Sequence, residues 1–133
     1  RESIERGVDL VVVDYLQLVN APGESLYQRV SHASRAFKKL SMQQDVPVIV
    51  LSQLSRALET QGRAPALSDL KDSGSIEQDA DIVMLLSRAG ESDTADTDTL
   101  CVHLAKNRNG PGGKVNLTFE KAFGRFKLSE RLN

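Results

Sequence analysis

The sequence predicts an α/β fold whose mixed, mostly parallel twisted sheet ends in an antiparallel meander. Two short β-branched runs, residues 8–13 and 46–51, flank a segment in which apolar residues recur every three or four positions. This strand–helix–strand order is typical of parallel strands joined by a crossover helix. Further short apolar runs toward the C-terminal end, separated by brief connections, favour antiparallel pairing there. The length of 133 residues fits one domain, or most of a larger one.

The first strand and the helix have the clearest patterns. Residues 8–13 (VDLVVV) form a nearly continuous β-branched run, which is typical of a strand buried on both faces. Ser25 followed by Gln28 predicts a capping box at the start of the helix. The apolar stripe of this helix consists of Leu26, Val30, Ala33, Phe37 and Leu40.

The second half of the chain is predicted to be strands and turns. The predicted strands cover residues 81–86, 100–105, 115–119 and 125–128. Residues 109–113 (NGPGG) are a strong turn signal. We interpret the acidic stretch 88–98 as a solvated connection rather than a binding site.

Composition excludes several classes of protein. No run approaches the ~18 apolar residues of a membrane span, and the balance of 40% hydrophobic and 26% charged residues is ordinary for a cytoplasmic globule. A single cysteine excludes an internal disulfide. With a net charge of −1, no tryptophan and 5% aromatic residues, the chain is poorly suited to stacking nucleic-acid bases. Any bound nucleic acid is therefore expected to be held through its phosphate backbone.

Polar residues directly follow the first two predicted strands. Asp14 comes after the first strand, and Gln53 comes two residues after the second. Open α/β sheets bind ligands outside the carboxyl ends of their strands, so both residues are expected at one edge of the sheet. An aliphatic run that ends in Asp is the Walker B pattern, whose carboxylate holds Mg²⁺, usually through water, beside the phosphates of ATP. A nearby Gln can sense the γ-phosphate, although each residue alone also fits a polar strand cap.

Two other segments carry groups that suit phosphate. Residues 73–75 (SGS) can expose successive backbone N–H groups, and Lys71 adds a positive charge beside them. Lys106 and Arg108, separated by one residue at a strand end, are expected to project to the same side. An ordinary loop explains the pattern at residues 71–75 equally well, and a solvated hairpin end explains the pattern at Lys106 and Arg108.

Taken in order, the four segments resemble the bacterial replicative helicase family (DnaB type). The matching strings are LVVVDYLQL at residues 10–18, VPVIVLSQLSR at 46–56, SDLKDSGSIEQDADIV at 68–83 and KNRNGP at 106–111. The resemblance extends from about residue 8 to residue 128. It implies that residues 1–133 are the C-terminal portion of a RecA-like helicase ATPase domain. It also implies a homo-hexameric ring with ATP between subunits and single-stranded DNA in the channel.

The resemblance implies a role for each residue at the ATP site. Asp14 matches the Walker B carboxylate that holds Mg²⁺, and Gln53 matches the γ-phosphate sensor. Lys106 and Arg108 match the cations that reach a neighbouring subunit's ATP, with Arg108 as the arginine finger.

The resemblance also implies a DNA-binding loop at Lys71, Asp72 and Gly74. The family often has Arg at the position of Lys71 and Glu at the position of Asp72. The charges are kept, but Lys lacks the forked guanidinium geometry, so a bidentate grip on phosphate is not expected.

The chain contains no Gly-x-x-x-x-Gly-Lys-Ser/Thr phosphate loop, which the family places upstream of the Asp14 strand. The glutamate that activates water also lies upstream in the family. The resemblance implies that the intact protein is a cytoplasmic, ATP- and Mg²⁺-dependent 5′-to-3′ DNA helicase that works with a primase and a loader. The 133-residue chain alone is expected to be inactive.

The absence of a phosphate loop is also consistent with a different class of function. The chain could be a non-catalytic module that binds helicase subunits or DNA. An in-frame phosphate loop encoded upstream of Arg1 favours the helicase, whereas a native start codon there favours the module. Recombinases and other RecA-like ATPases lack the SGSIEQD string at residues 73–79.

Overall fold

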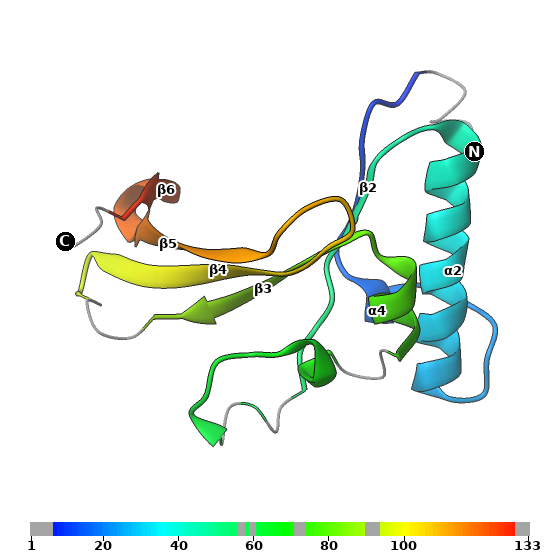
Figure 1. The fold of residues 1–133 in the computed structure, drawn as a ribbon, viewed down its shortest axis with the longest axis horizontal. Coiled ribbons are helices and arrows are strands. Elements are labelled where there is room, and N and C mark those ends of the chain that lie inside the picture. Colours follow the sequence, from blue (N-terminus) through cyan, green and yellow to red (C-terminus); the bar gives the residue numbers. More distant parts are fainter. Residues whose placement is uncertain (1–6, 56–57, 59–60, 71–73, 90–93, 130–133) are drawn as a thin grey trace. The chain divides into compact units, whose positions relative to one another are not determined.

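The computed structural model describes residues 7–55, 58, 61–70, 74–89 and 94–129. The chain forms two compact units, one comprising residues 1–61 and 68–80 and the other residues 62–67 and 81–133. Figure 1 shows the elements of each unit. In chain order these are β1 (Val11–Val13), the 3₁₀ turn η1 (Leu16–Leu18), α2 (Leu26–Gln44), β2 (Val48–Val50), η2 (Leu67–Asp69), α4 (Gly74–Asp79), β3 (Ile82–Arg88), β4 (Thr97–Asn107), β5 (Gly113–Glu120), η3 (Lys121–Phe123) and β6 (Arg125–Leu128).

The first unit contains the predicted strand–helix–strand motif. Strands β1 and β2 pair in parallel, with Val11 opposite Val48 and Val13 opposite Val50. The ladder continues past both strands, because the Leu51 N–H donates to the Val13 carbonyl at 2.9 Å. Helix α2 connects the two strands, so the predicted βαβ unit is confirmed.

Helix α2 begins and packs as its sequence predicts. The Ser25 side chain accepts a hydrogen bond from the Gln28 N–H at 3.2 Å, and the Gln28 side chain accepts one from the Ser25 N–H, which completes the capping box. Val30 and Ala33 on the apolar stripe are buried and form a core with Leu16 of η1. This core fixes the chain segment immediately after Asp14.

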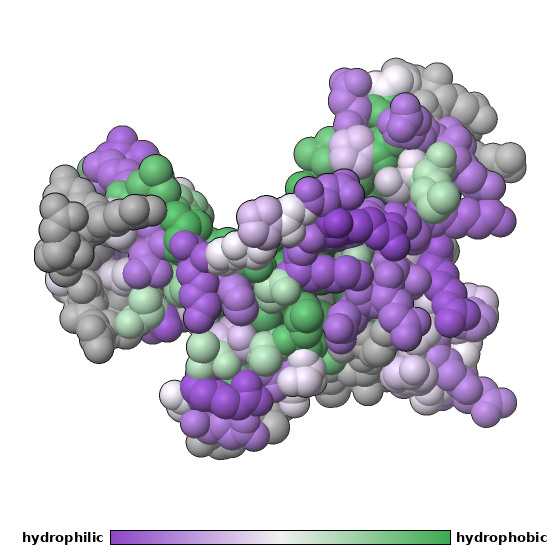
Figure 2. All heavy atoms as spheres, in the orientation of Figure 1, coloured by the Kyte–Doolittle hydropathy of each residue, from purple (hydrophilic) through white to green (hydrophobic). Residues whose placement is uncertain are grey.

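One face of the parallel pair is not covered by the described part of the chain. Val12 of β1 and Ile49 of β2 are 57% and 47% exposed. Figure 2 shows hydrophobic residues at the surface beside these strands, whereas the visible face of α2 is mainly hydrophilic. The expected burial on both faces is thus wrong within these residues, because α2 covers one side only.

The second unit is an antiparallel sheet in the order β3-β4-β5-β6. The predicted strands are present, and the turn signal at residues 109–113 lies where β4 passes to β5. The α/β class, the parallel pair and the C-terminal meander are therefore confirmed. Hydrogen bonding places the parallel pair in one sheet and the antiparallel strands in another.

The acidic connection is shorter than predicted, because β4 starts at Thr97. Asp98 consequently lies in a strand and forms ion pairs with Lys121 at 2.9 Å and Arg88 at 3.3 Å. The hydrogen bond from Lys121 is the main reason that the pKa of Asp98 is lowered. Asp98 therefore helps to hold β3, β4 and η3 together.

None of the helices in the described ranges combines the length and the apolar character that a membrane crossing requires.

Candidate functional site

Asp14 and Gln53 lie at the same edge of the parallel pair. The two strands end at Val13 and Val50, which face each other across the ladder, and both polar residues come just after these ends. Both are exposed. The Leu16 N–H donates to the Leu51 carbonyl at 2.8 Å and holds the two following segments together. This carboxyl edge, as the sequence predicts, presents a carboxylate and an amide to solvent.

Gln17 joins the segments that follow the two strands, and sequence reasoning did not single it out. Its Nε2 atom donates to Ser52 Oγ at 3.0 Å, and its Oε1 atom accepts from the Gln53 backbone N–H at 3.4 Å. Gln17 lies on η1, next to the buried Leu16, so its backbone is anchored in the core. In the sequence, the feature that could have indicated Gln17 is its place as a polar residue between two leucines, three positions after Asp14.

The donor set at this edge fits magnesium held together with a nucleotide. Mg²⁺ usually keeps several waters and takes one or two carboxylates in addition to substrate phosphates. Asp14 supplies an exposed carboxylate of this kind. Across the described ranges, His, Cys, Asp and Glu form no group of three or more that could cage a metal ion without a nucleotide.

The predicted DNA-binding loop is only partly described. Lys71 and Asp72 lie outside the described residues, and Gly74 is the first residue of α4. The segment before the loop is tied to the segment after Gln53: Leu54 forms a bridge with Leu70, and the Ser55 N–H donates to the Asp69 carbonyl at 2.8 Å. Backbone contacts thus connect the neighbourhood of Gln53 to the start of the loop.

Helix α4, on the other side of the loop, is fastened to α2 by two side-chain hydrogen bonds. Ser75 donates to Ser31 at 2.9 Å in a buried contact, and Ser34 donates to Asp79 Oδ2 at 2.7 Å. Ser31 and Ser34 are three residues apart and so face the same neighbour. Figure 1 shows α4 alongside α2. Sequence reasoning missed this clamp, although Ser31 stands beside the apolar stripe position Val30.

Lys106 and Arg108 lie where β4 ends, in the second unit. Lys106 is a half-buried strand residue, and Arg108 is in the exposed turn that follows. Arg108 contacts Asp81 twice: its backbone N–H donates to the Asp81 carbonyl at 2.9 Å, and its Nη1 atom donates to Asp81 Oδ1 at 2.7 Å. The Arg108 side chain is nevertheless 58% exposed.

The turn that carries Arg108 is built around Asn107. The Asn107 side chain donates to the Pro111 carbonyl at 3.2 Å and accepts from the Asn109 N–H at 3.3 Å. The chain then passes so close to β4 that a Cβ atom on Gly112 would lie 2.6 Å from the Leu104 carbonyl oxygen. A glycine is therefore required at this position, and the turn is narrowly defined.

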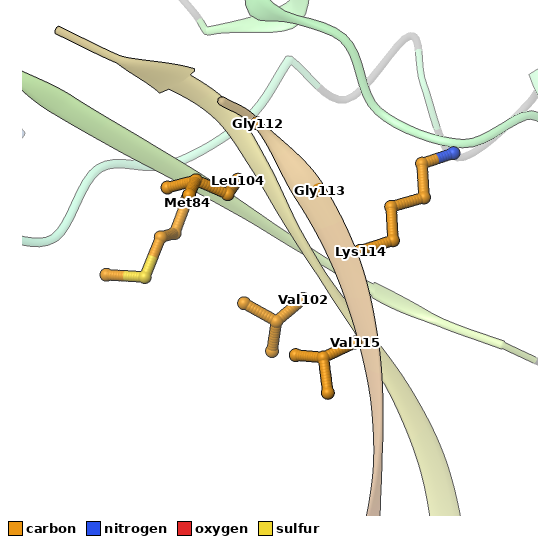
Figure 3. A pocket seen from close by; sticks show the side chains of 7 residues that line it. All are labelled: Met84, Val102, Leu104, Gly112, Gly113, Lys114 and Val115. Atoms are coloured by element: carbon orange, nitrogen blue, oxygen red, sulfur yellow. The ribbon is translucent and has the colours of Figure 1, made fainter. Parts of the chain in front are cut away.

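A hollow of about 350 Å³ lies on the sheet of the second unit, lined by Met84, Val102, Leu104, Gly112, Gly113, Lys114 and Val115. Figure 3 shows that Met84, Val102 and Val115 project to one side, whereas Lys114 projects to the other. The lining is mostly apolar, and the Lys114 side chain points away from it, so we interpret the hollow as an apolar sheet face.

The chain is similar to known proteins over nearly its whole length. Residues 1–128 match the sequence model of the DnaB-like helicase C-terminal domain. The replicative DNA helicase DnaB of Geobacillus stearothermophilus is 45% identical over 96% of this chain, which spans 29% of that relative. A solved structure of a DnaB-like replicative helicase, described with its interactions with primase, superposes with a TM-score of 0.85 at 39% identity, covering 98% of this chain and 33% of that one. A second solved structure, of an ATPase domain, gives a TM-score of 0.84 at 40% identity, covering 98% of this chain and 49% of that one. The chain belongs to the DnaB-like helicase C-terminal domain family.

Proposed function

We propose that this chain is part of an ATP-dependent replicative DNA helicase that moves 5′ to 3′ on single-stranded DNA and unwinds the duplex. The observation that carries this proposal is the exposed pair Asp14 and Gln53 at the carboxyl ends of adjacent parallel strands. Ligands of open α/β sheets bind at such an edge. Relatives named as replicative DNA helicases support the same function.

In this proposal the carboxyl edge binds Mg²⁺ and ATP. Asp14 holds the ion, usually through a water molecule, and the bound ion neutralises charge on the phosphates. Gln53 contacts the γ-phosphate with its amide. Its backbone is held by Gln17 at 3.4 Å, so the amide starts from a defined position.

Backbone contacts after Gln53 connect this proposed γ-phosphate sensor to the proposed DNA-binding loop. Movement of Gln53 would be passed to Leu54 and Ser55, which pair with Leu70 and Asp69 at the start of the loop. The loop that contains Lys71, Asp72 and Gly74 then holds the DNA backbone through the basic side chain and main-chain amides. Because α4 is clamped to α2, the far end of the loop stays fixed while its start moves.

Lys106 and Arg108 act, in the proposed homo-hexamer, on the ATP of a neighbouring subunit. Arg108 has a delocalised charge and several N–H donors, which suit the charge that develops during phosphoryl transfer. We further propose a primase and a loader as partners and a cytoplasmic location. The related structure described with primase supports the first of these partners.

The test compares variants of the complete protein at two matched pairs of positions. Asp14→Asn should abolish Mg²⁺-dependent ATP hydrolysis, whereas Asp9→Asn, at the opposite end of β1, should not. Gln53→Ala should retain ATP binding but lose the stimulation of hydrolysis by single-stranded DNA, whereas Gln43→Ala, on the exposed side of α2, should behave as wild type. Unchanged hydrolysis in Asp14→Asn would refute the ATP site. DNA binding that no nucleotide alters would favour a non-catalytic module.

The 133 residues alone should not hydrolyse ATP, because they contain no phosphate loop. Release of phosphate by the purified chain, stimulated by single-stranded DNA, would contradict this proposal.

A further inference from the structure

We propose that Asp81 is a positioning residue for Arg108: it fixes the direction of the guanidinium while leaving donors for phosphate. This inference rests on the proposed role of Arg108 as the cation that acts on a neighbouring ATP.

The contact between the two residues constrains both the backbone and the side chain of Arg108. The Arg108 N–H binds the Asp81 carbonyl at 2.9 Å, directly beyond the last strand pair, Ile82 with Asn107. The side-chain contact of 2.7 Å starts from this same anchored backbone. Asp81 therefore fixes both the backbone position of Arg108 and the direction of its guanidinium.

The pair still leaves Arg108 able to bind a ligand. A guanidinium has five N–H donors in a fixed fork, and Asp81 engages the Nη1 end. Toward the rest of the described chain, the guanidinium makes no other hydrogen bond or ion pair. With 58% of the Arg108 side chain exposed, its remaining donors face solvent, where a phosphate oxygen can reach them.

The pair is better suited to orientation than to stability. Exposed ion pairs contribute little to folding, and 46% of the Asp81 side chain is exposed. Orientation matters more for a group that acts on a transition state, because small displacements there lower the rate steeply. The carboxylate also restricts the rotamers of a long, otherwise mobile side chain.

The experiment is a double-mutant cycle in the complete, assembled protein with single-stranded DNA at saturation. Asp81→Ala should lower kcat for ATP about tenfold and change KM less than about twofold. The reason is that the guanidinium stabilises the transition state, so a misdirected guanidinium slows turnover without weakening the binding of ATP. Asp81→Asn keeps an acceptor for Nη1, so its kcat should stay within about threefold of wild type. In an Arg108→Ala background, Asp81→Ala should cause no further loss, since the residue that it positions is gone.

The outcomes separate this inference from the proposed function. If Arg108→Ala leaves turnover intact, the proposed role of Arg108 fails. If Arg108→Ala abolishes turnover but folded Asp81→Ala retains the wild-type rate, only the role of Asp81 is overturned. An equal loss from Asp81→Ala with and without Arg108 would show a structural role and would also overturn it. Should Asp81→Ala fail to assemble, the same cycle with Asp81→Leu, which has a similar shape but no acceptor for Nη1, decides: a loss confined to proteins that contain Arg108 supports the inference, and any other pattern overturns it.

Discussion

Replacing Gly112 with alanine tests whether the narrow turn after β4 holds Arg108 in place. The added Cβ would lie 2.6 Å from the Leu104 carbonyl oxygen, whereas ordinary contacts begin at 3.4 Å, so one of the two backbones must move by about 0.8 Å. Leu104 is paired with Gly113 in the ladder and cannot yield without loosening it. Overpacking of this kind costs about 1–3 kcal/mol.

Gly113→Ala is the matched control, because a Cβ there would meet nothing within 4 Å. Neither glycine has a positive φ, so backbone strain does not distinguish the two positions. In the larger complete protein, each kcal/mol should lower Tm by ~2–4 °C, which predicts a loss of ~2–12 °C for Gly112→Ala. Gly113→Ala should change Tm by less than about 2 °C.

The assay combines thermal unfolding with ATP hydrolysis in the complete protein. Gly112→Ala should also lower turnover by about tenfold, because the turn that carries Arg108 is displaced. Equal Tm values for the two alanine variants would refute the steric argument. A lower Tm with unchanged turnover would refute the link between the turn and Arg108.

Three other predictions concern the proposed DNA-binding loop, the hydrogen bond between α2 and α4, and Glu120 of β5. Lys71→Ala should weaken binding to all single-stranded sequences alike and reduce the salt dependence, measured by titration at several salt concentrations; a loss confined to some sequences would indicate base recognition instead. Ser31→Ala should lower the free energy of unfolding by about 1–3 kcal/mol, since the buried Ser75 hydroxyl loses its partner, and Ser31→Ala with Ser75→Ala should recover part of that loss in denaturant titrations. No recovery would mean that the hydroxyl pair is not the cause. The hydrogen bond from Lys127, followed by that from Arg125, lowers the pKa of Glu120 below its ordinary value of 4.5. The stability that Glu120 contributes is therefore present above pH 4.5 and is lost as the pH falls through the lowered pKa. The Tm difference between wild type and Glu120→Gln should shrink as the pH falls below 4.5 and disappear once the pH is below the lowered pKa of Glu120, and a difference that persists there would contradict the assignment.

Local sequence patterns predicted the strands, helix α2 and the edge that carries Asp14 and Gln53, but not α4 or the 3₁₀ turns, which are short. The capping box at Ser25, the apolar stripe of α2 and the turn at residues 109–113 each depend on neighbours a few positions away, and each is present. Parallel pairing followed from the length of the connection between the two β-branched runs.

Contacts between distant segments were beyond the sequence patterns. Ser31 with Ser75 and Arg108 with Asp81 join residues 44 and 27 positions apart, and no periodicity relates them. The burial of β1 was overpredicted for a related reason. A β-branched run shows that both faces are apolar, but it does not show which chain segment covers each face, and Val12 remains exposed here.

In the proposed function, the triphosphate binds at the carboxyl ends of β1 and β2. A structure of the complete protein with Mg²⁺ and a non-hydrolysable ATP analogue measures this directly. We predict that the Asp14 carboxylate lies within hydrogen-bonding distance of a water on the ion and that the Gln53 amide contacts the γ-phosphate. A nucleotide bound away from this edge, with both side chains facing bulk water, would contradict the claim.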